Sequence, residues 1–385
     1  MPGFEVIGKE EQNEVNEVFD KSKVLFRHGW DAQRNGIFKV REFELAFANY
    51  FGYEDALAVT SGTAALQVAM KAMNIGPGDE VITQAFTFVA TVEAIIEAGA
   101  TPVIAEIDKS LNMDPLDLEK KINNKTKLVI PVHMLGVPSN MDRILSVTRK
   151  FDIPVLEDTA WGCGGKYKGN FLGTLGDVAT FSFDFGKIMT TGEGGMILTK
   201  DNKILERAKA YQDHGHENNP NLPRWEDSRV SSGFNFRMME LQGAVGLAQL
   251  KKLPLVIEGQ RKSYYEMANI LNKFKQIEVR TSPDGSYETC DALVFLTEDL
   301  DTSRKCREML LAEGLGTKIL PEAITWHFAG TWNHMKELVA RNGDLSEACK
   351  VSRSWLHKSV ALPVSVFQDE ARLKKLEKAL GNVFN

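Results

Sequence analysis

Short apolar runs alternate with longer amphipathic stretches through the first two thirds of the chain. Runs at 81–85, 101–108, 127–133, 153–160 and 178–183 are apolar on both faces, which is typical of buried parallel strands. Between them, helices are predicted at 63–73, 88–99 and 140–151. Right-handed crossovers would place these helices on both faces of one sheet, with a binding crevice at the carboxyl ends of the strands. The pattern therefore predicts an α/β fold with a mostly parallel central sheet.

The pattern changes near residue 251. A helical stretch at about 255–274 leads into weaker, mixed strand and helix signals, and a final helix is predicted at 370–383. A chain of 385 residues is long enough for two domains. We therefore expect a large domain at 1–250 and a smaller C-terminal α+β domain at 251–385.

Composition narrows the classes of function. The net charge of −6 without a basic cluster argues against a nucleic-acid partner, and no apolar stretch approaches the ~20 residues of a membrane span. We therefore expect a cytoplasmic protein. The four cysteines are scattered, without the spacing of a zinc or redox motif, so we expect them to be reduced and structural and expect no metal site.

Lys187 is the first candidate for chemistry. It lies in FSFDFGKIMTTGEGG, residues 181–195, where a strand ending at Ser182 meets a loop and a Gly-rich turn. An amine that binds a cofactor aldehyde covalently needs such a loop position, a lowered pKa and small neighbours. From spacing alone, a solvated loop lysine is the favoured reading, because lysines next to glycines are common.

Two further motifs lie where a strand meets a helix. In VTSGTAALQVAM, Ser61, Gly62 and Thr63 lead into a helix whose free N–H groups could bind phosphate, or Ser61 and Thr63 could act as plain caps. In VLEDTAWG, Glu157 and Asp158 end a strand and face opposite sides, so only one can point into the crevice. Asp158 is our candidate for holding a pyridine nitrogen protonated. A helix cap or a metal ligand is the alternative reading.

Taken in order, SGTAAL, TFVAT, EDTA, FSFxxxKxxTTGEGG and GFNFRMMELQGAVGLAQL closely resemble the DegT/StrS sugar aminotransferases. The resemblance spans nearly the whole chain and implies the fold-type-I architecture of enzymes that use pyridoxal 5'-phosphate (PLP), with the pyridoxamine form as intermediate. It implies that Lys187 carries PLP as a Schiff base and moves the proton, and that Asp158 pairs with the pyridinium nitrogen. The remaining cofactor contacts that it implies are Phe88 on the ring and Gly62, Thr63, Ala64 and Ser182 at the phosphate.

The resemblance also concerns assembly and one departure. Asn235 of GFNFR resembles an asparagine that reaches the phosphate from the neighbouring subunit, which implies a homodimer with shared active sites. Three residues after the aspartate the family usually has Gln or His, which hydrogen-bonds the cofactor, whereas this chain has Trp161. An indole N–H donates one bond and accepts none. Trp161 therefore either replaces that contact or shapes the substrate pocket.

A finer resemblance concerns the substrate. MPGFE, YQDHGH and TWHFAGTWNH are similar to family members that make 8-amino-3,8-dideoxy-manno-octulosonate, an aminated relative of the lipopolysaccharide sugar Kdo. L-glutamate would be the amino donor and an oxidised Kdo-type octulosonate the acceptor. The candidate substrate contacts are His214, His216, Trp326 and His327, for each of which a structural role is equally compatible with the sequence.

Three alternatives stay open at this point. A nucleotide-linked keto-deoxysugar is another acceptor that this family would take. A PLP-dependent sugar dehydratase is disfavoured, because those relatives have His where this chain has Lys187. A catalytically silent PLP-fold regulator is the last, although no DNA-binding segment accompanies the fold.

Overall fold

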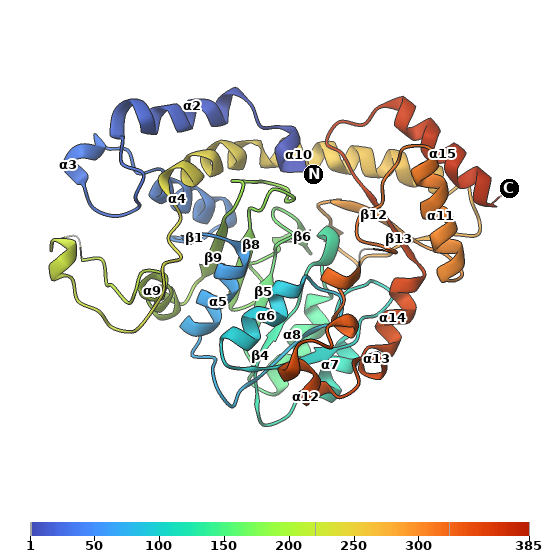
Figure 1. Ribbon diagram of the computed structural model, residues 1–385, viewed down its shortest axis with the longest axis horizontal. Coiled ribbons are helices and arrows are strands. Elements are labelled where there is room, and N and C mark those ends of the chain that lie inside the picture. Colours follow the sequence, from blue (N-terminus) through green and yellow to red (C-terminus); the bar gives the residue numbers. More distant parts are fainter. Residues whose placement is uncertain (1, 220, 323, 385) are drawn as a thin grey trace.

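A mostly parallel central sheet organises the protein. The computed structural model describes residues 2–219, 221–322 and 324–384. Parallel bridges Val129–Val155 and Val132–Asp158 join two groups of paired strands into one order, β1-β9-β8-β5-β4-β2-β3. Only β9 runs against its neighbours in this order, so the predicted sheet is confirmed (Figure 1). The strands are β1 (Leu57–Val59), β2 (Glu80–Gln84), β3 (Thr101–Ala105), β4 (Thr126–Ile130), β5 (Leu156–Asp158), β8 (Val178–Ser182) and β9 (Gly195–Thr199).

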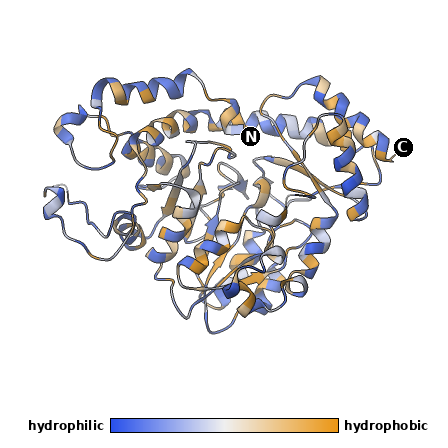
Figure 2. Ribbon diagram, in the orientation of Figure 1, coloured by the Kyte–Doolittle hydropathy of each residue, from blue (hydrophilic) through white to orange (hydrophobic). Residues whose placement is uncertain are grey.

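Helices cover both faces of this sheet because successive strand residues point to opposite sides. In β9, Met196 and Leu198 pack into a cluster with α4 (Lys39–Phe51) and α10 (Glu240–Leu271). Ile197, between them, packs with α5 (Gly62–Ala72), α6 (Val89–Glu97) and α9 (Asn202–Tyr211). Hydrophobic residues accordingly concentrate in the strands and the inner helices, while α2 (Lys9–Glu17) is mostly hydrophilic (Figure 2).

A side-chain cap precedes each of two crossover helices, α7 and α8. Asn140 caps α8 (Met141–Lys150) by accepting from the Arg143 N–H. Asp114 caps α7 (Pro115–Lys121), whose first residue is a proline that needs no N–H partner there. Both helices pack on β2, β3 and β4 through one apolar cluster. The helices predicted at 63–73, 88–99 and 140–151 are thus present; the first begins one residue earlier than predicted at the same length, and the other two are slightly shorter.

The C-terminal region contains an antiparallel sheet of β10 (Glu278–Val279), β12 (Ala292–Leu296) and β13 (Ser359–Pro363). It packs with α11 (Leu300–Ala312), α15 (Glu370–Phe384) and the second half of α10. The predicted helix start near Leu255 is wrong, because α10 continues from Glu240 through Pro254. Pro254 is exposed, while Leu253 and Val256 on either side are buried in the core. The expected domain boundary at 250/251 therefore falls inside a helix.

A helix from the C-terminal region also closes the edge of the central sheet. Asn342, at the end of α12 (Lys336–Asn342), accepts from the Ile104 N–H at 2.9 Å and donates to the Pro102 carbonyl at 2.9 Å. These groups of the edge strand β3 would otherwise lack hydrogen-bond partners from a neighbouring strand.

The remaining elements are α1 (Pro2–Glu5), α3 (Asp31–Arg34), α13 (Leu345–Ala348), α14 (Lys350–His357), β6 (Lys166–Tyr167), β7 (Asn170–Phe171), β11 (Ser286–Tyr287), a π-helix (Val18–Ser22) and short 3-10 turns at Met134–Gly136, Arg224–Glu226, Ile324–Trp326 and Ala329–Thr331.

Candidate active site

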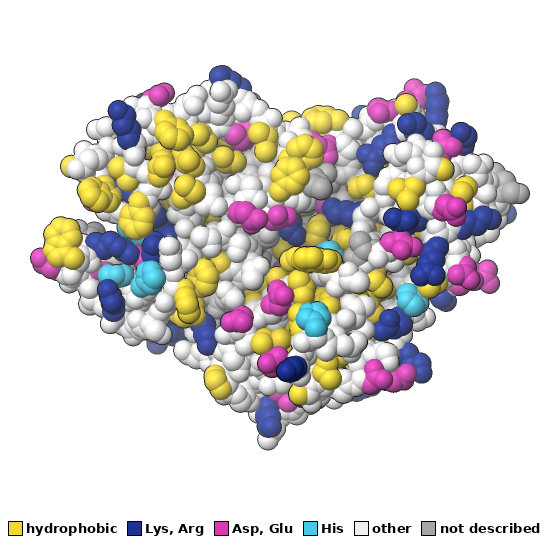
Figure 3. All heavy atoms as spheres, viewed as in Figure 1, with side chains coloured by type: hydrophobic (Ala, Val, Ile, Leu, Met, Phe, Trp, Pro, Cys, Tyr) yellow, Lys and Arg dark blue, Asp and Glu magenta, His cyan; other side chains and the backbone are white. Residues whose placement is uncertain are grey.

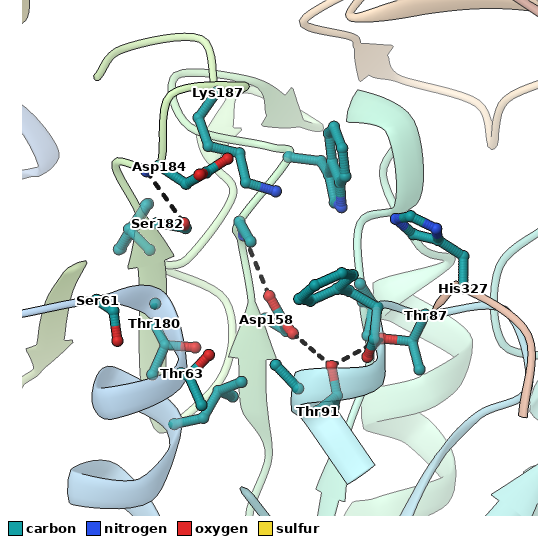
Figure 4. Close-up of a pocket in the computed structure, with 18 of the residues that line it drawn as sticks. Ser61, Thr63, Thr87, Thr91, Asp158, Thr180, Ser182, Asp184, Lys187 and His327 are labelled. Atoms are coloured by element: carbon teal, nitrogen blue, oxygen red, sulfur yellow. Dashed lines mark hydrogen bonds between the residues drawn. The ribbon is translucent and has the colours of Figure 1, made fainter. Parts of the chain in front are cut away.

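A cavity of about 370 Å³ opens at the carboxyl ends of β5 and β8, beside the N-termini of α5 and α6. This is the crevice that the strand pattern predicts for an α/β sheet. Figure 4 shows its polar side chains pointing into one space. The predicted residues that line it are Gly62, Thr63, Phe88, Asp158, Trp161, Ser182, Lys187 and His327.

Lys187 is buried, with only 9% of its surface exposed, although it lies on a loop. Its N–H donates to the Asp184 carbonyl at 3.0 Å, and its Nζ lies 3.4 Å from the centre of the Trp161 ring. Burial lowers the pKa of the amine from 10.5 to about 8, while Asp291, Asp158 and Asp184 act in the opposite direction. The amine is therefore desolvated, and a larger fraction of it is neutral at physiological pH than for an ordinary lysine.

Asp158 and Glu157 point to opposite sides of β5. Asp158 accepts from the Thr91 hydroxyl at 3.0 Å and from the Ala160 N–H at 3.1 Å, inside the pocket (Figure 4). Burial raises the pKa of Asp158, against the lowering effects of these two bonds and of Lys187. Glu157 instead accepts from three backbone N–H groups of residues 173–176 and bonds His133 at 3.0 Å. Glu157 is thus a structural residue, and Asp158 is the one of the two carboxylates that faces the crevice.

The start of α5 meets the end of β8 at one end of the pocket. A Cβ added to Gly62 would lie 2.7 Å from the Ser182 Cβ, so only glycine allows this close approach. Gly62 and Thr63 line the pocket, where their helix-terminal position favours an anion. Ala64 does not fit its predicted role, because its N–H donates to the capping Ser61 Oγ at 3.0 Å and it lies outside the lining.

Aromatic side chains form the opposite rim. Phe88 is 37% exposed, and its ring lies nearly parallel to that of Trp326 with centroids 6.2 Å apart. His327 lies 5.2 Å from Phe88 and 6.3 Å from Trp161, measured between ring centroids. Trp326 is 63% exposed at the mouth and is outside the lining itself. The pocket therefore combines a polar floor with a flat apolar edge.

Three predicted residues lie away from this pocket, on the segment after α9. His214 is exposed, whereas His216 is buried and bonds Asp227 at 3.0 Å through Nδ1. Asn235 is exposed and bridges Asp213. None of the three lines the cavity of its own chain. The geometry therefore gives His216 a structural role, because its ring closes a turn within this segment.

The structure adds residues that sequence reasoning missed. Thr91 binds Asp158, and Thr87 is 2.8 Å from the Thr91 hydroxyl. Glu193 lines the pocket, and burial together with the charge of Asp184 raises its pKa. Thr87 and Thr91 lie in TFVAT, which also contains Phe88, and Glu193 lies in TTGEGG, shortly after Lys187. Their position in these two motifs was the signal by which the sequence could have identified them.

One buried polar atom bears on what the pocket can hold. Among the described residues, the Thr180 hydroxyl has no hydrogen-bond partner, and Thr180 lines the cavity. Such an atom is costly unless a ligand or water satisfies it. Together with a desolvated amine, a buried carboxylate and a helix N-terminus, it fits a ligand that carries an aldehyde, a ring nitrogen and a phosphate. PLP has these three groups.

Neither a membrane-spanning helix nor a cluster of metal ligands is found in the described parts of the chain. No helix there is long and apolar enough to cross a membrane. No group of three or more His, Cys, Asp or Glu side chains within the described ranges is arranged to hold a metal ion. All four cysteines are buried and free.

Comparison with known proteins gives the same picture. The profile of the DegT/DnrJ/EryC1/StrS aminotransferase family matches residues 6–380. The chain is 35% identical over 347 residues to a GDP-perosamine synthase of Caulobacter vibrioides, covering 89% of each. Among solved structures, it is similar to an aminotransferase from Psychrobacter cryohalolentis (TM-score 0.83, 26% identity, 98% of both chains). It is also similar in fold to the PLP form of the putative sugar aminotransferase Spr1654 from Streptococcus pneumoniae (TM-score 0.85, 22% identity, 98% of both chains). This chain is a PLP-dependent aminotransferase of the DegT/DnrJ/EryC1/StrS family.

Proposed function

We propose that this aminotransferase moves an amino group from L-glutamate to a ketone or aldehyde of a sugar, with Lys187 as its catalytic residue. The observation that carries the proposal is the buried Lys187 amine, which shares one pocket with Asp158 and the start of α5. In this arrangement Lys187 would hold the cofactor, and its amine would move the proton in both halves of the reaction.

The environment of Lys187 suits both tasks. A pKa of about 8 leaves roughly a tenth of the amines neutral at pH 7, and a neutral amine is the form that attacks a carbonyl or accepts a proton. The Trp161 ring lies 3.4 Å from Nζ and limits the directions from which water reaches it. This distance supports a role for Trp161 as a wall beside the reacting amine rather than as a hydrogen-bond donor to the cofactor.

Asp158 and the start of α5 would hold the cofactor at two ends. When bound, PLP supplies an aldehyde and a pyridine ring that withdraws electrons while its nitrogen is protonated. The Asp158 carboxylate, oriented by Thr91 and Ala160 at 3.0 and 3.1 Å, would keep that proton in place. Gly62, Thr63 and Ser182 would hold the phosphate, and Phe88 would lie on the ring.

A second copy of the chain would complete each site. Asn235 is exposed and does not line its own pocket, so its predicted phosphate contact would have to be made to a neighbouring subunit. Exposed hydrophobic side chains support such an interface: Phe19, Leu25, Trp30, Leu45, Phe234 and Met239 are each at least 37% exposed. Figure 3 shows hydrophobic side chains gathered around α2 and α4 on the drawn face. We propose a homodimer with shared active sites.

For the acceptor we propose an oxidised Kdo-type octulosonate, which would yield 8-amino-Kdo for lipopolysaccharide. The nearly parallel Phe88 and Trp326 rings and the adjacent His327 form an apolar platform with a polar edge, which suits a sugar acid. His214, on the segment with Asn235, would reach a substrate only in a neighbouring subunit.

A nucleotide-linked keto sugar is the second candidate acceptor. The similarity to a GDP-perosamine synthase over 89% of both chains favours it. Because the two acceptors differ in charge and size, one panel of half-reactions separates them. The pyridoxamine form of the enzyme should convert the eight-carbon aldehyde with the higher specificity constant. A much higher constant for a GDP- or UDP-linked hexulose would favour the alternative.

The role of Lys187 is tested separately from the acceptor. Borohydride reduction of the yellow enzyme, followed by peptide mapping, should place the reduced cofactor on Lys187. Cofactor found on another lysine would refute the proposed catalytic residue. A glutamate-dependent shift of the absorbance band would exclude a catalytically silent homologue.

A further inference from the structure

The N-terminal segment crosses the loop that carries Lys187. In α1, the Gly3 N–H donates to the carbonyl oxygen of Lys187 itself at 3.0 Å. The rings of Phe4 and Phe185 stack beside this bond, with centroids 5.1 Å apart and planes inclined by 29°. In Figure 1 the end marked N accordingly lies beside α10, between α2 on one side and α11 and α15 on the other.

The contact at Gly3 is a close approach of two backbones. A Cβ at this position would lie 2.8 Å from the Lys187 carbonyl oxygen and 3.0 Å from the Ile188 carbonyl oxygen. Real Cβ atoms do not approach backbone oxygens so closely without a shift. Because neither oxygen can rotate away as a flexible side chain would, a methyl group here must move the loop or the segment.

The other end of the segment is fixed to distant parts of the chain. The Glu5 carboxylate accepts from the Val366 N–H at 2.9 Å, in the turn after β13. The Lys252 amine of α10 donates to the Val6 carbonyl at 2.7 Å. Residues 2–6 therefore link the Lys187 loop to α10 and to the C-terminal region.

The Lys187 loop is otherwise held from its two ends. Its first half is closed by the Asp184 carboxylate, which accepts from the Gly186 N–H at 2.9 Å. Its second half is tied at Thr190, whose N–H donates to the Gln249 side chain at 3.2 Å. The hydrogen bond from Gly3 lies between these two contacts. It holds the carbonyl group of Lys187 and therefore limits the position of the Lys187 Cα, from which the side chain extends.

We infer that residues 2–6 are a positioning segment, which fixes the backbone of Lys187 and thereby the place of its amine in the pocket. The inference rests on the proposed function in one respect, namely that Lys187 holds the cofactor. The segment does not touch the reacting atoms. It acts through the loop, and displacing it should misplace the amine against Trp161 and Asp158.

The test compares two Gly→Ala substitutions, one inside residues 2–6 and one just after them. Gly3→Ala forces a methyl group against the loop, whereas at Gly8 an added Cβ would make only an ordinary contact, 3.5 Å from the Glu10 carboxylate. For Gly3→Ala we expect the pH midpoint of the cofactor absorbance band to shift by about half a unit or more. We also expect the glutamate half-reaction to slow by about tenfold to a hundredfold. Gly8→Ala should leave both quantities and the melting temperature at the parental values.

A milder pair of variants decides the matter if Gly3→Ala does not fold. Phe4 is 42% exposed, so Phe4→Ala should fold while loosening the stack on Phe185. In Phe4→Ala the pH midpoint of the cofactor absorbance band should shift in the same direction as in Gly3→Ala. Phe4→Tyr keeps the ring and should therefore show the parental midpoint. A parental midpoint in Phe4→Ala, and in Gly3→Ala where it folds, would overturn the inference. Borohydride mapping of the parent separates the two proposals, because cofactor on another lysine refutes the role of Lys187 itself.

Discussion

Removing the charge of Asp291 should lower the pKa of Lys187. Asp291 is buried, 1% exposed, and its Oδ2 lies 2.6 Å from the Lys318 amine. Lys318 and Lys187 both approach the Trp161 ring, at 4.9 and 3.4 Å from its centroid. Asp291 raises the pKa of Lys187 and Lys318 lowers it. In Asp291→Asn the raising charge is lost while the lowering charge remains.

The two centroid distances limit the separation of the Lys187 and Lys318 amines to about 8 Å, and Asp291 Oδ2, 2.6 Å from the Lys318 amine, therefore lies within about 11 Å of the Lys187 amine. At about 11 Å, unit charges interact by about 1.5 kcal/mol with an effective dielectric constant of about 20. One pKa unit corresponds to about 1.4 kcal/mol, so loss of the Asp291 charge should lower the pKa of Lys187 by about one unit. From a parental pKa of about 8, the neutral fraction at pH 7 would then rise from about a tenth to about a half.

Competitive acetylation of the cofactor-free enzyme across a pH series measures this directly. Mass spectrometry of the peptide that contains Lys187 should give a midpoint near pH 8 for the parent and about one unit lower for Asp291→Asn. The matched control is Asp291→Asn combined with Lys318→Met, which removes both charges and should return the midpoint toward the parental value. Labelling is done well below each melting temperature, because removing one partner of a buried pair costs about 3 to 5 kcal/mol.

Two results would refute this reasoning. A parental midpoint near the ordinary lysine pKa of 10.5 would show that burial does not desolvate the amine as described. An upward shift in Asp291→Asn would show that the lost charge does not act on Lys187.

Further substitutions probe the cofactor contacts and the assembly. Asp158→Asn should slow the glutamate half-reaction by about a hundredfold or more, because a neutral amide does not stabilise a protonated pyridine; a parental stopped-flow rate would contradict its role. Gly62→Ala, whose Cβ would lie 2.7 Å from that of Ser182, should weaken PLP binding about tenfold or more in a titration of the cofactor-free enzyme. Lys187→Ala and Asn235→Asp should each be inactive, the second by repulsion of the phosphate. Mixed and exchanged, they should regain up to about half of the parental activity per hybrid dimer, whereas an exchanged mixture without activity would show that Asn235 does not serve a neighbouring site.

Much of the pocket could be predicted because its residues lie at the ends of buried strands. Lys187, Asp158 and Gly62 each follow or precede an apolar run that the sequence makes visible, and parallel strands bring such ends to one edge. Thr91 was not predicted, since its contact with Asp158 joins positions 67 residues apart. Asp291 and Lys318 were missed for the same reason: their effect on Lys187 exists only once the C-terminal region packs against Trp161.

Other expectations failed for local reasons. The pattern of hydrophobic and polar residues changes near residue 251, but α10 does not end at that position. It continues because residues on both sides of Pro254 are buried in the core. Ala64 stands in the same motif as Gly62, yet the cap formed by Ser61 uses its N–H. His216 was selected because the YQDHGH segment resembles relatives that act on an octulosonate, and in the structure its ring bonds Asp227.

The continuous helix α10 restricts how this protein can be divided or can move. At 1.5 Å per residue its 32 residues form a rod of about 48 Å, and both regions of the chain fold onto it. Dividing the chain at residue 250 would split α10 into two shorter helices whose apolar faces are exposed. The two halves, expressed separately, should therefore aggregate rather than fold. Any relative motion of the two regions would have to bend this rod, and Pro254, which lacks an N–H for the helical ladder, is the point where bending costs least.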